Sequence, residues 1–143
     1  MNRHPALVPL SEDHHHELVQ ARRLRAAAEA EAEERLSAAA AYVDTFFTTT
    51  VEHFRREEEE LFPVYLRQPG ANASLVDRIL REHMELHGLA RALRAEVTGQ
   101  DASPDTLREL GTLLHEHVRV EERELFEAIQ ETVPAAELDR LPT

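Results

Sequence analysis

The sequence contains no cysteine, no tryptophan and little glycine. The absence of cysteine excludes a disulfide scaffold, an iron–sulfur cluster, a thiolate zinc site and a cysteine nucleophile. Four glycines and seven prolines are too few for a fibrous or loop-rich protein. No apolar run approaches the roughly 20 residues of a membrane span, and the first residues lack the apolar segment of an export signal. We therefore expect a cytoplasmic protein that does not bind membranes.

Lysine is also absent, so all 16 basic residues are arginine, which is typical of a GC-rich bacterial genome. With 28 acidic residues the net charge is -12. Nucleic acids carry a dense negative charge, so an acidic chain without a basic stripe is not expected to bind them. Histidine, by contrast, is abundant: there are nine, and most of them stand beside acidic residues.

Between the breaks that glycine and proline mark, apolar residues recur at helical spacing, and no segment alternates as a strand does. The pattern predicts four long helices, over residues 11–30, 35–66, 74–97 and 104–131. We expect Ser74 to cap the third helix. Long helices joined by short loops fold as an up-down-up-down four-helix bundle, so the predicted class is all-α. A chain of 143 residues fits one domain, residues 1–143, with its core over about residues 10–131.

The sequence repeats itself by pairs of helices. Residues 52–65 resemble residues 116–129 at a constant offset of 64, and both segments place a histidine four residues before a glutamate. Residues 12–25 resemble residues 81–94 at an offset of 69, which aligns a histidine of the first helix with one of the third. The chain therefore consists of two helix pairs that carry histidines at corresponding depths.

Residues four apart on a helix leave it on the same face, one turn apart. Three such pairs lie on the apolar faces of the predicted helices: His53 with Glu57, His83 with His87, and His117 with Glu121. Burying carboxylates and imidazoles is costly unless they are paired or bind metal. With His14 of the first helix, which the repeat aligns with His83, the set has five histidines and two glutamates. This exceeds what one tetrahedral zinc needs, so the set favours two ions of iron or manganese bridged by carboxylates. The alternative is a bundle with an apolar core and solvated histidines.

Two short runs leave a choice between neighbouring residues. In the triplet that begins the first repeat, His14 fits the apolar stripe of the helix better than His15, which stays the alternative. In the acidic run over residues 57–60, Glu58 and Glu59 are expected to form a solvated face.

These motifs resemble those of the hemerythrin-like, or HHE cation-binding, domains, over nearly the whole chain. The matching segments are DHHH in the first helix, HFRREEEELFP in the second, REHMELH in the third and EHVRVEE in the fourth. The resemblance implies a four-helix bundle that holds a non-haem di-iron centre. Carried over residue by residue, it implies two ligands on one iron, three on the other and two bridges: His14 and His53; His83, His87 and His117; Glu57 and Glu121.

The sequence departs from the oxygen-carrying hemerythrins at the last ligand, which in them is an aspartate five residues after the histidine. That position is Glu122 here, whereas Glu121 matches the spacing of the wider group and echoes Glu57. The resemblance implies an open position on the two-histidine iron for oxygen, nitric oxide or peroxide. We expect a protein that binds or senses oxygen or another small diatomic. The alternatives are a peroxidase-like or peroxide-decomposing enzyme, an iron store, or a metal-stabilised interaction module.

Overall fold

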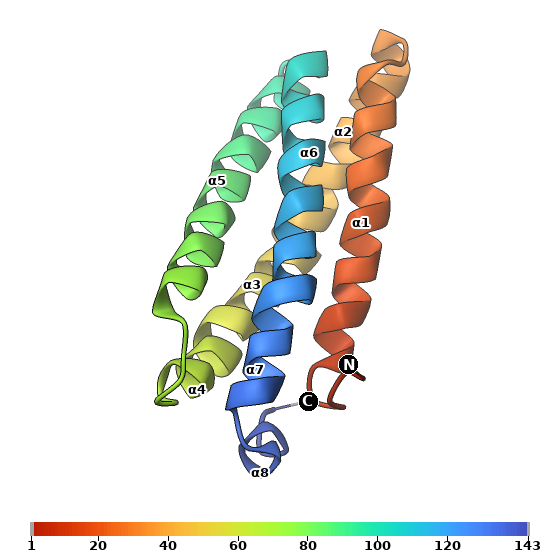
Figure 1. The fold of residues 1–143 in the computed structure, drawn as a ribbon. Coiled ribbons are helices and arrows are strands. Elements are labelled where there is room, and N and C mark those ends of the chain that lie inside the picture. Colours follow the sequence, from red (N-terminus) through yellow and green to blue (C-terminus); the bar gives the residue numbers. More distant parts are fainter. Residues whose placement is uncertain (1, 143) are drawn as a thin grey trace.

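The computed structural model describes residues 2–142 as a bundle of four long helical rods that run alternately up and down (Figure 1). The predicted all-α, up-down-up-down four-helix bundle is confirmed, and residues 2–142 contain no strand. The first rod is α1 (Val8–Ala28) and the third is α5 (Ala73–Thr98). π-helical turns, labelled η, interrupt the other two rods. The second rod consists of α2 (Ala32–Thr45), η1 (Phe46–Thr50), α3 (Val51–Arg56), η2 (Glu57–Leu61) and α4 (Phe62–Leu66). The fourth rod consists of α6 (Pro104–Val120), η3 (Glu121–Leu125) and α7 (Phe126–Thr132), and the short helix α8 (Ala135–Leu138) follows it.

The helix starts follow from local side-chain chemistry, with one correction. The cap of α5 is Asn72, whose Oδ1 accepts the backbone N–H of Leu75 at 3.1 Å, so the prediction of Ser74 was wrong by two residues. Pro104 stands in the first turn of α6, where its missing N–H costs nothing. The residue before it, Ser103, donates its own backbone N–H to the Glu96 carboxylate at 2.7 Å.

Two of the π-helical turns begin at Glu57 and Glu121, the two glutamates that the family resemblance implied as ligands bridging two metal ions. In η2 the N–H of Phe62 bonds to the carbonyl of Glu57, and in η3 the N–H of Phe126 bonds to the carbonyl of Glu121. These two hydrogen bonds are 64 residues apart, so the internal repeat extends to the backbone. Single π-helical turns inside α-helices are rare and concentrate at functional sites.

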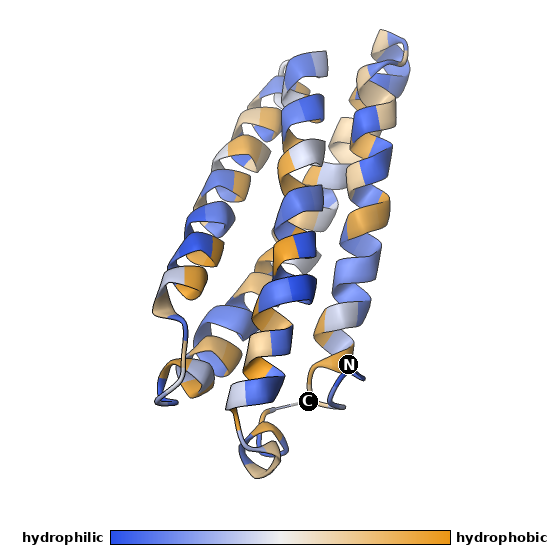
Figure 2. Ribbon diagram, viewed as in Figure 1, coloured by the Kyte–Doolittle hydropathy of each residue, from blue (hydrophilic) through white to orange (hydrophobic). Residues whose placement is uncertain are grey.

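The core consists of two apolar clusters with a buried polar layer between them. One cluster gathers around Phe46, Leu93 and Leu110, and the other gathers around Tyr65, Ile79 and Ile129. The buried polar side chains lie between these clusters along the rods: His14, Glu17, Thr50, His53, Glu57, Glu82, His83, His117 and Glu121. Figure 2 shows hydrophilic residues distributed along all the rods, and within residues 2–142 no helix has the length and apolar content of a membrane span.

The first and last rods approach each other closely at Gly111. A Cβ at this position would lie 2.9 Å from the carbonyl oxygen of Ala21 and 2.7 Å from Cγ of Arg25. We expect Gly111→Ala to lower the free energy of unfolding by about 1–3 kcal/mol, because the helices must move apart. Gly88 has open space around its Cβ position, so Gly88→Ala should instead raise stability by about 0.5–1 kcal/mol. Urea denaturation measures both, and a stabilising Gly111→Ala would contradict the close approach.

Candidate metal centre

The structure brings six of the seven predicted ligands together in the polar layer. Their ligand atoms form two groups of four, and within each group all atoms lie within 4.8 Å of one another. The groups share both glutamates: His14, His53, Glu57 and Glu121 in the first; Glu57, His83, His117 and Glu121 in the second. None of the six side chains is more than 2% exposed.

The two shared glutamates contact histidines of both helix pairs. Glu57 lies 3.3 Å from Nε2 of His53, one turn earlier on the same rod, and 3.2 Å from Nε2 of His83 on α5. Glu121 lies 2.9 Å from Nε2 of His117 and 2.6 Å from Nε2 of His14 on α1. Each carboxylate therefore stands between two imidazoles from different rods, which is the position that a bridging ligand occupies.

Each of the four buried histidines has a second carboxylate at its other ring nitrogen. The Nδ1 atoms contact these groups at 2.7–3.0 Å: His14 with Glu122, His53 with Asp13, His83 with Glu58, and His117 with Glu82. Metal-binding histidines almost always donate their non-coordinating N–H to such a partner, which fixes the tautomer and the ring orientation. The four Nε2 atoms are thereby left free to face the two shared glutamates.

Sequence reasoning missed these outer carboxylates. Glu58 is exposed, as expected for a solvated face, but its carboxylate also reaches Nδ1 of His83 on a neighbouring rod at 2.7 Å, a contact that was not predicted. The internal repeat contained the signal. Asp13 and Glu82 both precede the aligned histidines of the first and third helices, and Glu58 and Glu122 both follow the aligned glutamates.

His87 lies outside both ligand groups of the described residues. Its half-buried ring stands edge-on against Phe46, with 5.1 Å between ring centroids. The internal repeat aligns it with Leu18, which has no ligand atom, so the assignment of His87 to the second iron stays a prediction. In the triplet of α1 the structure buries His14 and leaves His15 exposed.

The negative charge of the centre outweighs the effect of burial on its histidines. Burial alone lowers the pKa of His53, but the charge of Glu57 and the hydrogen bond to Asp13 raise this pKa to about 10. Burial also lowers the pKa of His117 and of His83. The surrounding carboxylates outweigh this effect and raise the two pKa values to about 9 and about 11. Without a metal ion the site therefore takes up protons, and a divalent cation supplies the same positive charge.

Several buried atoms of the centre lack a hydrogen bond even though charged neighbours are close. Both carboxylate oxygens of Glu57, Oε2 of Glu121 and Nε2 of His117 have no hydrogen-bond partner among the described residues. Buried polar atoms without partners are rare and costly. Imidazole nitrogen and carboxylate oxygen together suit iron, manganese or zinc, so the donor set and its unsatisfied atoms fit a metal ion.

The outer carboxylates generate a prediction about metal affinity. Glu58→Ala removes the hydrogen-bond partner of His83 and should weaken metal binding about 10- to 100-fold. The side chain of the adjacent Glu59 is 63% exposed and forms an ion pair with Arg55 at 3.6 Å, so Glu59→Ala serves as the matched control. Competition with a chelator measures both affinities, and equal values for the two variants would contradict the role of Glu58.

The raised histidine pKa values predict how stability depends on pH without metal. Because the folded state holds protons that an unfolded histidine releases near pH 6.5, their contribution is complete below about pH 6.5. It is lost as pH rises through the folded pKa values of about 9 to 11. The Tm of the metal-free protein should therefore fall as the pH rises above about 7, and that of the metal-loaded protein should fall much less. Parallel decreases would contradict this account.

Comparison with known proteins assigns the fold and the centre to a family. Residues 7–129 match the family model described as the hemerythrin HHE cation binding domain, which covers both helix pairs and all six clustered residues. A search of the curated proteins found no match. The match, together with the buried histidine and glutamate groups, supports metal binding. The chain belongs to the hemerythrin HHE cation-binding family.

Proposed function

We propose that this protein binds a small ligand at a non-haem di-iron centre. The observation that carries the proposal is the pair of four-donor groups that share Glu57 and Glu121. His14 and His53 would hold one ion, and the histidines of the second helix pair would hold the other. The two shared glutamates would bridge them. Manganese accepts the same donors.

The ligand set of the second ion includes one further residue in this proposal. His87 would complete it as a third histidine beside His83 and His117. This requires its ring to leave the present position against Phe46, one turn along α5 from His83. With His87 bound, the second ion would have more protein ligands than the first, which would leave the open position on the His14–His53 side.

The surroundings of the centre suit the binding of a small molecule. When bound, a pair of iron ions supplies redox chemistry and an open coordination position. The chain itself orients the imidazoles through the outer carboxylates and covers them with aromatic rings. Phe54 stacks on His83 with ring centroids 3.8 Å apart, and Phe126 lies 5.1 Å from His14. These rings shield the imidazoles of His83 and His14 from water.

The proposed ligands are oxygen, nitric oxide or peroxide, and the proposed role is binding or sensing in the cytoplasm of a bacterial cell, by a single domain over residues 1–143. A peroxide-decomposing enzyme is the second candidate. It is favoured by one more buried carboxylate, that of Glu17, whose oxygens have no hydrogen-bond partner among the described residues. Such a group is suited to handle the protons of peroxide chemistry. Iron storage or a metal-stabilised interaction module would need the same ions without ligand chemistry.

The metal content of protein purified without a histidine tag tests the proposal directly. We expect about two iron ions per chain, one for each four-donor group. His117→Ala and Glu57→Ala should each remove most of the iron while the circular dichroism of the helices persists, because each variant takes a donor from the groups. Elemental mass spectrometry gives the iron content.

His115 lies near the centre in sequence but outside both groups, so His115→Ala is the control and should keep the iron of the unsubstituted protein. Retention of both ions in His117→Ala or Glu57→Ala would refute the ligand assignment. Reversible spectral change with oxygen or nitric oxide would favour a binding role, whereas turnover of peroxide well above that of free iron would favour the enzyme.

A further inference from the structure

The two halves of the centre match in their ligands but not in the residues around them. Aligned by the internal repeat, the first half carries polar side chains where the second half carries leucines: Glu17, Gln20 and Thr50 against Leu86, Leu89 and Leu114. Leu86 and Leu114 belong to the apolar cluster around Phe46, and the partly buried Leu89 packs against it. The second half therefore shows that the bundle can fill these positions with hydrocarbon, and the first half does not do so.

Among these polar residues, Glu17 has the greatest free-energy cost of burial, because it carries a carboxyl group. It lies on α1 one turn after His14, is only 4% exposed, and neither carboxylate oxygen has a hydrogen-bond partner among the described residues. Leaving a buried carboxyl without a partner is strongly unfavourable. At the aligned position Leu86 is fully buried, so packing alone does not require a carboxyl group.

The Glu17 carboxyl stands at a cavity that reaches the centre at His53, on the side of the first helix pair. This cavity, of about 220 Å³, is lined by Glu17, Thr50 and His53 together with the outer carboxylate Asp13. The aligned surface of the second half has a groove of its own, lined by residues that include Glu85. That groove has no lining atom from His117 or from the leucines that align with Glu17 and Thr50. Of these two cavities, the one of the first half is lined by a histidine of the centre and the one of the second half is not.

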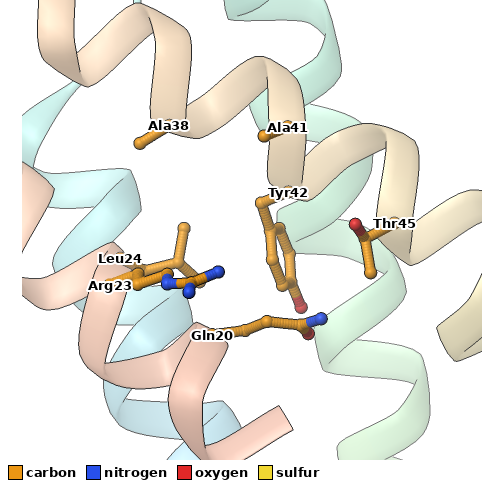
Figure 3. Close-up of a pocket in the computed structure, with 7 residues that line it drawn as sticks. All are labelled: Gln20, Arg23, Leu24, Ala38, Ala41, Tyr42 and Thr45. Atoms are coloured by element: carbon orange, nitrogen blue, oxygen red, sulfur yellow. The ribbon is translucent and has the colours of Figure 1, made fainter. Parts of the chain in front are cut away.

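A second cavity continues the first one between α1 and α2. It has a volume of about 120 Å³ and shares Gln20 and Thr45 with the larger cavity. In Figure 3 the hydroxyl of Tyr42 and the amide of Gln20 face each other, and both Tyr42 Oη and Gln20 Oε1 are buried without a hydrogen-bond partner. Burial, aided by the charge of Glu17, raises the pKa of Tyr42, so its hydroxyl keeps its proton. Polar groups thus continue from Glu17 away from the centre.

We propose that Glu17 receives hydrogen peroxide in the cavity beside His53, with a carboxyl oxygen accepting a hydrogen bond from the O–H of the ligand. A carboxyl group has an acceptor oxygen whether or not it is protonated, and peroxide has hydrogen to donate. Oxygen and nitric oxide have none, so they gain nothing from this acceptor. The inference rests on the proposed di-iron centre and deepens it, because it names a protic peroxide as the ligand class.

The test compares Glu17→Leu, which copies the second half, with Glu17→Gln, which keeps an acceptor oxygen. In iron-loaded Glu17→Leu we expect the hydrogen peroxide concentration for half-maximal change of the iron absorption spectrum to rise about tenfold or more. The affinity of the reduced protein for nitric oxide should stay within about threefold of the unsubstituted value. Glu17→Gln should keep both values within about threefold. Glu85→Leu, in the groove of the second half, is the matched control and should change neither.

Two further readouts do not depend on ligand chemistry. Glu17→Leu should keep its iron content, and its metal-free form should melt at a higher temperature than the unsubstituted protein, because a buried carboxyl without a partner is removed. Loss of iron or a lower Tm would make Glu17 a structural residue and overturn the proposal. Unchanged peroxide concentration in Glu17→Leu, or equal weakening of peroxide and nitric oxide, would also overturn it.

A tenfold loss of peroxide binding in Glu17→Gln would overturn the proposal as well, because this variant keeps an acceptor oxygen. These outcomes differ from failure of the di-iron proposal itself. That failure would appear as missing iron in the unsubstituted protein, and it would leave the spectra without a signal for any variant.

Discussion

The structure depends on one constraint: six ionisable side chains are buried together in the middle of the bundle, between two apolar clusters. Four imidazoles and two carboxylates at 0–2% exposure cannot stay there without compensation. Two means of compensation follow from the sequence. Each imidazole gains an outer carboxylate, and the inner carboxylates gain positive charge from protons or from metal. The apolar clusters on either side offer these groups no polar partners, which makes this compensation necessary.

The outer carboxylates also connect the two helix pairs. Asp13 and Glu82 serve histidines of their own helix pair, since they contact His53 and His117. The glutamates that follow the bridging residues do the opposite, because Glu58 reaches into the second pair and Glu122 reaches into the first. Neither pair therefore completes its own histidines. The contacts of Glu58 with His83 and of Glu122 with His14 therefore link the two helix pairs at the centre.

Sequence patterns predicted the fold class and six clustered residues because both depend on periodicity within a helix. Spacing of four places His53 with Glu57 on one face wherever the neighbouring rods lie. The contact of Glu58 with His83 depends instead on the distance between rods, and no single-helix pattern contains it. The π-helical turn that begins at Glu57 has no composition signal of its own. The position of His87 against Phe46 likewise depends on packing between rods. Comparison of the two repeats, rather than of single residues, carried the most information.

The reciprocal contacts between the halves have a consequence for how such a centre arises. In these contacts each half supplies a carboxylate to a histidine of the other half. Identical subunits related by a twofold axis make reciprocal contacts of this kind. Two copies of a helical hairpin would form the same six-residue cluster as a homodimer, and both sides of it would then be identical. Joining the hairpins in one chain removes that identity. A single chain can keep Glu17 on one side and Leu86 on the other, which a symmetric homodimer cannot, so the surroundings of the two donor groups can differ.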